Sequence, residues 1–286
     1  MGSEGAVAEL ETGGLERELR VKRALAELDE LVGLARPKEV VREIKAFVAV
    51  AARRRAFGLA AEPLVLHMVF RGNPGTGKTT VARVLGRVFA AMGVLSGGQL
   101  VEVERADLVG EYIGHTAQKT REKLKKAEGG ILFIDEAYAL ARGGNKDFGK
   151  EAIDTLVKAM EDMKDRLVLI LAGYQLEMAR FLDANPGLRS RFPIHLEFPD
   201  FSVDELMEIA DRMLAKREYA FGPGARDRLV ALLRAETTAG GRNAGNARLV
   251  RNTIEAAIRR QAVRVVDAAD LSRAAVTTIA PADLRL

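Results

Sequence analysis

The sequence predicts an α/β domain, built on a parallel sheet with helices on both faces, followed by a small all-helical domain. Between residues 28 and 200, short apolar runs alternate with helical patterns, which is typical of a parallel sheet covered by helices. Beyond residue 200 the pattern is helical only. A chain of 286 residues, 48% of them hydrophobic, suffices for one large domain and a smaller companion.

The first segment, residues 1–27, is predicted to be a tail followed by a charged helix. It begins with a Gly-rich stretch and continues as LERELRVKRALAEL, with leucines three or four residues apart. No pattern that carries chemistry is visible there, so we place this segment outside the α/β domain.

The α/β domain is predicted to span residues 28–200 and the helical domain residues 201–286. Four apolar runs each predict a buried strand followed by a turn or helix: LVLHMVFRG, GQLVEVERA, GGILFIDEA and RLVLILAGY. Near the start of the helical domain, Ser202 and Glu205 fit a capping box, and apolar residues at helical spacing follow them.

Composition excludes several classes of protein. There are no cysteines and only three distant histidines, so neither a disulfide nor a zinc site is expected. No apolar run approaches the roughly 18 residues of a membrane span, and the N-terminal stretch lacks the pattern of an export signal. We therefore expect a cytoplasmic protein without membrane contact. The net charge is +4, and the basic residues are not clustered, so nucleic acid is an unlikely partner.

The strongest motif is a predicted phosphate-binding loop. Residues 72–79 read GNPGTGKT and match G-x-x-x-x-G-K-[ST], directly after a predicted strand and before a helix. Glycines allow backbone N–H groups to face phosphates, Lys78 reaches the β and γ oxygens, and the Thr79 hydroxyl ligates magnesium. ATP and Mg²⁺ are the expected ligands. The predicted binding residues are Pro74, Gly75, Thr76, Gly77, Lys78, Thr79 and Thr80.

An acidic pair supplies the second half of the predicted site. In ILFIDEA, four apolar residues lead to Asp135 and Glu136 at the end of a buried strand. Beside a phosphate loop, Asp135 is suited to hold magnesium, and Glu136 to orient or deprotonate the attacking water. Without that loop, an acidic pair at a strand end is usually only solvated.

The order of five segments makes the chain resemble the AAA+ ATPases, from about residue 28 to residue 265. These segments are ELVGL, GNPGTGKTT, ILFIDEA, GLRSRF and GNARLVRN. Within that family, EYIGHTAQKT, ILFIDEAYAL and LILAGY are similar to the branch that holds stage V sporulation protein K and the red-type Rubisco activase CbbX. VEVERADLVGEYIGHTAQKT and GNKDFGKEAIDTLVKAMED resemble the sporulation protein more closely.

The resemblance implies a homo-oligomeric ring, usually of six subunits, with ATP bound between neighbours. It places Val32 and Gly33 at the adenine pocket. It implies that an arginine reaches the γ-phosphate of the next subunit, with Arg191 as first choice and Arg189 as second. It also implies that Arg248, at the start of a helix of the lid domain, reaches the nucleotide.

A loop that contacts a protein substrate is predicted at Tyr112, Ile113 and Gly114. These residues lie between the second predicted strand and its helix, where AAA+ remodelling enzymes place an aromatic-aliphatic-glycine loop in a central pore. The alternative is a tyrosine packed in a turn or in the core. Residues 142–149 form either a second pore loop or a long surface loop. Tyr174 stands where the family often has a polar residue, and either hydrogen bonding or packing is possible there.

Three functional hypotheses follow. The first is a ring-forming ATPase that remodels or threads a protein substrate, in the setting of sporulation by resemblance, with Rubisco activation as the near alternative. The second is a DNA-directed ATPase, because such motors share the nucleotide motifs. The third is a scaffold that binds ATP but barely hydrolyses it, against which Glu136 argues.

Overall fold

The computed structural model describes residues 3–61, 64–112, 114–142, 148–239, 245–266 and 272–285, with the backbone alone for residues 3–15, 238 and 239. The chain forms two compact units. One, the sheet unit, comprises Met1–Arg71 and Lys78–Glu197, and the other, the helical unit, comprises Gly72–Gly77 and Phe198–Leu286. The two units are described separately below.

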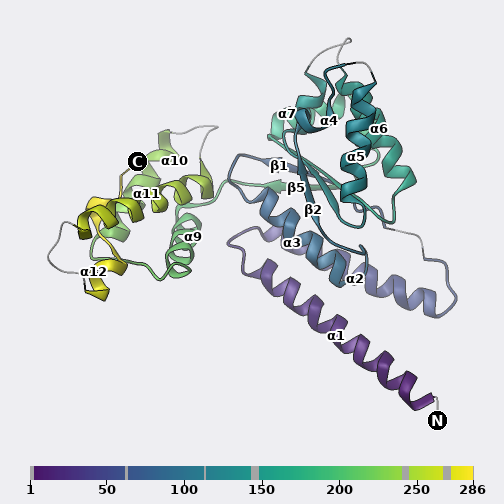
Figure 1. Cartoon of the computed structure of the whole chain (residues 1–286), viewed down its shortest axis with the longest axis horizontal. Helices are drawn as coiled ribbons and strands as arrows, with labels where there is room; N and C mark the ends of the chain where they lie inside the picture. The colour runs from purple at the N-terminus through teal and green to yellow at the C-terminus, as the bar shows by residue number, and fades with distance from the viewer. Residues whose placement is uncertain are drawn as a thin grey trace. The chain divides into compact units, whose positions relative to one another are not determined.

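The sheet has five strands in the order β2-β3-β4-β1-β5 (Figure 1). β2 pairs with β3, β3 with β4 and β4 with β1, all in parallel. β3 and β4 are buried along their whole length, which explains their unbroken apolar sequences. The strands are β1 (Met68–Gly72), β2 (Leu100–Val103), β3 (Ile131–Ile134), β4 (Val168–Gly173) and β5 (Ile194–Phe198).

The register of the sheet places the end of β3 level with residues near the carboxyl end of β4 and with the middle part of β1. Ile134 pairs with Leu171, and Leu171 pairs with Val69. β4 separates β3 from β1, so residues at the same level on these two strands are about 10 Å apart. Asp135, which follows β3, therefore emerges at the edge where β1 leads into the phosphate loop.

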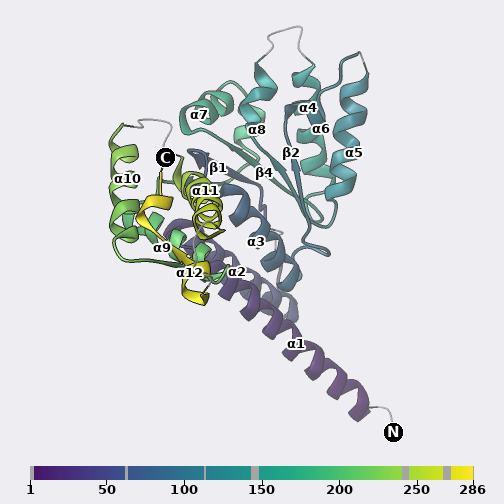
Figure 2. The same cartoon turned by 60° about the vertical axis from the view of Figure 1, so that its left-hand side comes forward.

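Helices cover both faces of this sheet. In Figures 1 and 2, α1, α2 and α3 lie on one side, and α5 and α6 lie on the other. The helical elements are α1 (Ser3–Asp29), α2 (Ala35–Ala56), α3 (Lys78–Ala91), α4 (Arg105–Leu108), α5 (His115–Ala127), η1 (Ala137–Ala141), α6 (Gly149–Asp162), α7 (Gln175–Asp183) and α8 (Pro186–Arg189). None of the helices within the described ranges is long and apolar enough to cross a membrane.

The N-terminal segment differs in extent from the tail and helix expected over residues 1–27. It forms one helix from Ser3 to Asp29, and this helix belongs to the sheet unit. The reason is contact with α3 and the turn after it: Leu28 is buried, Glu27 pairs with Arg87, and Arg17 donates to the Met92 carbonyl.

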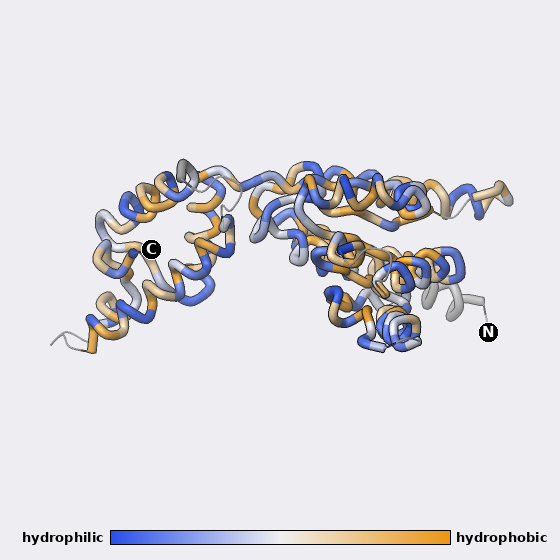
Figure 3. The backbone as a smooth tube through the Cα atoms, turned by 90° about the horizontal axis from the view of Figure 1, so that it is seen from above, coloured by the Kyte–Doolittle hydropathy of each residue, from blue (hydrophilic) through white to orange (hydrophobic). Residues whose placement is uncertain are grey.

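The helical unit contains α9 to α12 (Figure 2). It also contains a short pair of strands. Hydrophobic and hydrophilic residues alternate along the helices, as expected for helices that bury one face (Figure 3). The predicted capping box is confirmed: Ser202 accepts from the Glu205 backbone, and Glu205 accepts from the Ser202 backbone. The helices are α9 (Val203–Ala215), α10 (Ala225–Ala239), α11 (Asn246–Val266), α12 (Arg273–Thr277) and η4 (Pro281–Asp283).

The expectation that strands stop after residue 199 is wrong in one detail. β6 (Ala220–Phe221) pairs in parallel with β7 (Thr278–Ile279) inside the helical unit. Strands of two residues are too short to produce an alternating pattern in the sequence. The α/β class followed by a helical domain is otherwise confirmed.

Candidate nucleotide site

The phosphate loop connects β1 to α3, and its glycines adopt a conformation that other residues rarely adopt. Gly75 has φ 75° and Gly77 has φ 94°. α3 begins at Lys78 and has no acidic residue in its first turn. The N–H groups and the helix dipole of that first turn, which includes Thr79 and Thr80, therefore favour an anion.

Close packing also requires glycine at position 75. A Cβ atom there would lie 2.5 Å from the Gly245 carbonyl oxygen and 3.0 Å from the Arg248 backbone nitrogen. Thr76 is fully buried, and its hydroxyl donates to the Asn73 carbonyl at 2.8 Å. The shape of the loop is therefore fixed by its own hydrogen bond from Thr76 to Asn73 and by packing against the start of α11. Both contacts lie within the helical unit. Pro74 belongs to the same contact, because its carbonyl accepts from Asn246.

The acidic pair lies where β3 ends, at the carboxyl ends of the sheet strands, and Glu136 is exposed there. The Asp135 backbone donates to the Val103 carbonyl at 2.9 Å, and the Glu136 backbone donates to Asp135 Oδ1 at 2.9 Å. Glu136 has φ 45°, in the left-handed region. The turn after β3 therefore fixes one oxygen of Asp135 and directs Glu136 away from the strand.

Two residues next to Glu136 were not predicted from the sequence. Tyr138 is 8% exposed and forms a side-chain hydrogen bond with Glu136. Burial and, secondly, the Glu136 charge raise the pKa of the Tyr138 hydroxyl, so it is a proton donor at neutral pH. An Arg142 nitrogen lies 4.0 Å from Glu136 Oε2, and its guanidinium carbon lies 5.0 Å from the centre of the Tyr138 ring.

Tyr174 packs against the same cluster. Its ring centre is 6.2 Å from that of Tyr138, with the planes tilted by 44°. Of the two possibilities left open by the sequence, this contact favours packing.

The residues present fit a nucleotide phosphate chain and a magnesium ion. Gly75 and Gly77 have the positive φ that lets backbone N–H groups turn toward phosphates, and the first turn of α3 carries Lys78 and Thr79 without a competing acid. A hydroxyl and a carboxylate are oxygen ligands of the kind that Mg²⁺ prefers, so Thr79 and Asp135 would hold it.

The two candidate arginines lie in and after α8 and have partners within their own chain. Arg191 is bound to Glu161 and donates to the Gly187 carbonyl at 2.9 Å. Arg189 donates to Asp183 at 2.8 Å. Arg191 is the less exposed of the two, at 32% of its side chain against 66% for Arg189. Its geometry is therefore the better defined.

The remaining predicted nucleotide contacts lie on two separate segments. Val32 is buried in the turn between α1 and α2, and Gly33 has φ 62°. Arg248 lies in the first turn of α11. Val32 and Gly33 belong to the sheet unit, and Arg248 belongs to the helical unit with Gly75.

The predicted substrate loop lies between α4 and α5, and Tyr112 is on its surface. Tyr112 is 66% exposed, and its ring contacts that of His115 edge to face with centres 5.5 Å apart. Gly114 has φ 85° and precedes α5, and a Cβ atom added there would meet nothing within 4 Å. Ile113 lies outside the described residues, as do residues 143–147 of the possible second loop.

A polar cluster beside the phosphate loop was also missed. Asp200 accepts from Asn73 and from Asn246, residues far apart in the sequence. The only local signal was the pair Gly245-Asn246 directly before a helical pattern, because glycine and asparagine are the residues that adopt positive φ readily.

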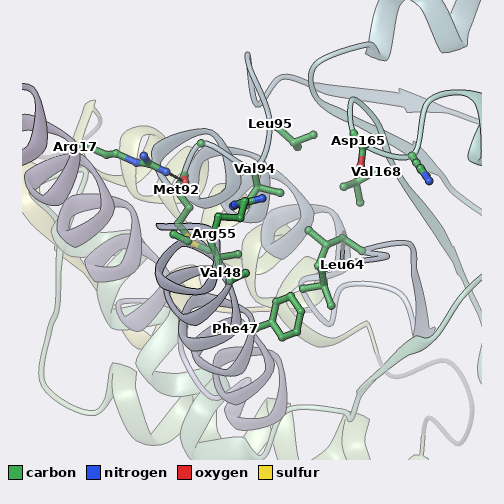
Figure 4. Close-up of a pocket in the computed structure, with 15 residues that line it drawn as sticks. Arg17, Phe47, Val48, Arg55, Leu64, Met92, Val94, Leu95, Asp165 and Val168 are labelled. Atoms are coloured by element: carbon green, nitrogen blue, oxygen red, sulfur yellow. Dashed lines mark hydrogen bonds between the residues drawn. The ribbon is translucent and has the colours of Figure 1, made fainter. Parts of the chain in front are cut away.

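A pocket of about 380 Å³ opens at the opposite edge of the sheet (Figure 4). Leu66, just before β1, and Val168, the first residue of β4, line it, which places the pocket at the amino ends of these strands. None of the residues predicted to bind the nucleotide lines this pocket. It is therefore separate from the candidate site.

A phosphate loop between a strand and a helix, with an acidic pair ending a parallel strand, defines a P-loop nucleoside triphosphatase. The model of the ATPase family associated with various cellular activities (AAA) matches residues 68–200, and that of the AAA lid domain matches residues 202–286. The chain belongs to the AAA family of ATPases. Its reaction is ATP hydrolysis.

Similar proteins place the chain in the branch predicted from the sequence. Stage V sporulation protein K of Bacillus subtilis is 54% identical over 93% of this chain and 83% of its own length. Protein CbbX of Cereibacter sphaeroides is 47% identical over 92% of this chain and 86% of its own length. The chloroplastic ribulose bisphosphate carboxylase/oxygenase activase of Cyanidioschyzon merolae is 44% identical over 87% of this chain and 85% of its own length.

A solved structure supports the fold. The Holliday junction branch migration motor RuvB from Thermotoga maritima superposes with a TM-score of 0.53 and 24% identity, over 87% of this chain and 69% of that one. At this identity the likeness concerns the fold alone.

Proposed function

We propose that the protein is a ring-forming ATPase, with six subunits, that couples ATP hydrolysis to the remodelling or threading of a protein substrate in sporulation. The sporulation setting is supported by 54% identity to a protein named for that process. The ring is supported by membership of the AAA family and by an arginine suited to act on a neighbour.

In this proposal, the catalytic groups come from the carboxyl edge of the sheet. Lys78 and the N–H groups of the phosphate loop hold the β- and γ-phosphates, and Glu136 accepts a proton from the attacking water. When bound to Thr79 and Asp135, Mg²⁺ would draw negative charge from the phosphate oxygens. Val32 and Gly33 contact the adenine.

Two arginines link hydrolysis to the rest of the ring. Arg191 leaves its own Glu161 and reaches the γ-phosphate held by the next subunit, where its delocalised charge stabilises the transition state. Arg248 contacts the nucleotide from α11. The start of α11 is tied to the phosphate loop, because the Ala247 backbone donates to the Gly75 carbonyl at 3.1 Å.

The observation that carries the protein-substrate part is the exposure of Tyr112. An aromatic side chain that is 66% exposed beside an unobstructed Gly114 lacks the burial of a core residue. An exposed ring offers a large contact area to an extended peptide without demanding a particular sequence. With Ile113, it forms the proposed substrate loop.

A second candidate function is activation of ribulose bisphosphate carboxylase/oxygenase. It is favoured by the relative of that name, which is 44% identical. Both candidate functions use ATP hydrolysis to pull on a protein. They share this mechanism and differ only in the protein that is the substrate. A DNA-directed motor is not favoured.

The test measures ATP hydrolysis by the purified protein with casein, an unstructured model protein, or with duplex DNA, at low and at roughly fourfold higher salt. We expect casein to stimulate hydrolysis at both salt concentrations and Tyr112→Ala to lose the stimulation. Stimulation by DNA alone that falls steeply with salt would contradict the proposal, because contacts with DNA phosphates weaken with salt.

A further inference from the structure

Asn246 is a buried polar residue at the first position of α11, and its backbone is constrained. The residue is 2% exposed, and its φ of 47° lies in the left-handed region. A buried amide without hydrogen bonds costs free energy, and a left-handed backbone restricts the choice of residue. Both features point to a specific requirement for asparagine at this position.

The Asn246 side chain connects three segments of the helical unit. Its amide nitrogen donates to Asp200 Oδ1 at 2.8 Å and to the Pro74 carbonyl at 3.3 Å. Its oxygen accepts from the Phe201 backbone at 2.9 Å. One side chain therefore bonds the phosphate loop, the segment before α9 and the start of α11.

Asp200 completes the connection from the other side. Besides Asn246, it accepts from the Asn73 side chain at 2.9 and 3.0 Å, one distance for each carboxylate oxygen. Asn73 and Pro74 are adjacent in the phosphate loop. Asp200 and Asn246 thus hold two successive loop residues.

The backbone contacts next to this cluster fix the loop and α11 together. The Ala247 backbone donates to the Gly75 carbonyl at 3.1 Å, and the Arg248 backbone donates to the Gly245 carbonyl at 3.0 Å. The bond from Ala247 holds the backbone at Gly75, in the loop whose N–H groups are predicted to face a phosphate. The same contacts set the position from which the Arg248 side chain leaves the helix.

We propose that Asn246 and Asp200 are positioning residues that hold the phosphate loop in its nucleotide-binding shape and fix the start of α11, which carries Arg248. They do not touch the reacting atoms; they act through Asn73, Pro74 and Gly75. This inference rests on the proposed nucleotide role of the loop.

The experiment exchanges the two side-chain types. Asn246→Asp replaces the donor by a carboxylate facing Asp200 and the Pro74 carbonyl, and we expect the Kd for a fluorescent ADP analogue to rise about tenfold or more. Adding Asp200→Asn restores a donor opposite the new carboxylate. The double variant should recover most of the affinity, though not all, because Pro74 still lacks its donor.

A matched control keeps the charge change but moves it to the exposed surface of the same helix. Asn252→Asp on α11 should bind the analogue as the parent protein does. The KM for ATP should rise with the Kd in Asn246→Asp, whereas kcat at saturating ATP should change less. A merely structural role would lower the melting temperature and leave the Kd of the folded protein unchanged.

Each outcome decides the inference. Parental affinity in Asn246→Asp, or no recovery in a folded double variant, overturns it. If Asn246→Asp does not fold, Asn246→Gly takes its place, because glycine keeps the left-handed backbone and removes only the side chain. Parental affinity in that variant would overturn the inference as well.

A separate variant distinguishes this inference from the proposed function. Lys78→Ala should weaken binding of an ATP analogue if nucleotide occupies the loop. If Lys78→Ala weakens binding and Asn246→Asp does not, only the positioning role fails. If Lys78→Ala also binds as the parent does, the nucleotide site itself is wrongly assigned.

Discussion

The acidic turn of the sheet unit and the phosphate loop of the helical unit are held in opposite ways. Glu136 contacts Asp135, Tyr138 and Arg142, all within six residues of it along the chain. The phosphate loop is held by side-chain bonds that span 127 and 172 residues. The partners described for the Glu136 side chain are therefore close to it in the sequence, whereas the phosphate loop has side-chain partners far from it in the sequence.

Because the two regions differ in this way, we expect substitutions in each region to change a different kinetic constant. A change in the acidic turn should alter the chemical step, because the turn carries Glu136, the proposed base. A change in the cluster around Asp200 alters nucleotide affinity, because the loop depends on that cluster for its shape. Variants that affect kcat and KM separately are the means of testing the contrast.

The largest expected effect comes from a residue outside both regions. Arg191→Ala should bind nucleotide normally and lose turnover on the order of a thousandfold, as when an arginine that stabilises the transition state is removed. Steady-state hydrolysis and binding of an ATP analogue measure the two quantities. Glu161→Gln is the matched control, since it breaks the same ion pair and should keep most activity.

Mixed rings test whether Arg191 serves a neighbour. Inactive Arg191→Ala subunits combined with inactive Lys78→Ala subunits should regain some hydrolysis, because an intact loop then faces an intact arginine. Proven co-assembly without recovery would leave Arg191 with a role in its own subunit only. Arg189→Ala should lose less turnover than Arg191→Ala.

The second prediction concerns stability of the sheet unit at low pH. His67 is 3% exposed, its Nδ1 accepts from the Leu169 backbone at 3.1 Å, and burial lowers its pKa to about 4. A pKa below the unfolded value means that the unfolded chain binds the proton first, so stability is full above about pH 6.5 and falls as pH approaches 4.

Between about pH 7.5 and about pH 5, we expect this group to cost roughly 2 kcal/mol of the free energy of unfolding. Urea unfolding at both pH values measures it. His67→Gln should unfold more easily at the higher pH and show a shallower loss on acidification. An equal loss in both proteins would assign the pH dependence to other groups.

The third prediction addresses the local support of the catalytic base. Tyr138→Phe keeps the ring contacts with Tyr174 and Arg142 and removes only the hydroxyl that bonds Glu136. We expect kcat to fall about fivefold, the equivalent of one ordinary hydrogen bond, with KM for ATP unchanged. A raised KM with unchanged kcat would contradict the expectation that the acidic turn affects the chemical step and the phosphate loop affects nucleotide affinity. Tyr174→Phe is the control and should retain kcat.

The smallest expected effect is on stability at the substrate loop. Tyr112→Ala should shift the melting temperature by about a degree or less, because truncating an exposed ring leaves no cavity. Basal ATP hydrolysis should also be retained, and stimulation by casein should be lost. A drop of many degrees would instead indicate a packed aromatic, for which about 3 to 5 kcal/mol is typical.

The sequence predicted the parts of the fold and site that depend on local pattern. Four of the five sheet strands, the phosphate loop and the acidic pair come from short motifs whose residues are adjacent in the chain. The AAA assignment rested on the order of five such motifs and is confirmed. β5 was not identified, because its sequence IHLEF lies between prolines and is only partly apolar.

The rest depended on contacts that only folding creates. Nothing near Asp200 in the sequence indicates that Asn73 and Asn246 will both donate to it. In the sequence, Tyr138 is only one more residue of an apolar run after the acidic pair. The structure is needed to show that its hydroxyl interacts with Glu136. In both cases a side chain makes a specific polar contact that residue type alone does not encode.

The most direct test of the account measures binding and hydrolysis together in Glu136→Gln. The amide cannot accept the proton of the attacking water, whereas Lys78 and Thr79 remain to hold phosphates and magnesium. We predict parental affinity for ATP, hydrolysis reduced to a small fraction of the parent rate, and accumulation of ring assemblies with ATP by light scattering. Hydrolysis at the parent rate would contradict the assignment of Glu136 as the base and, with it, the role of the acidic turn.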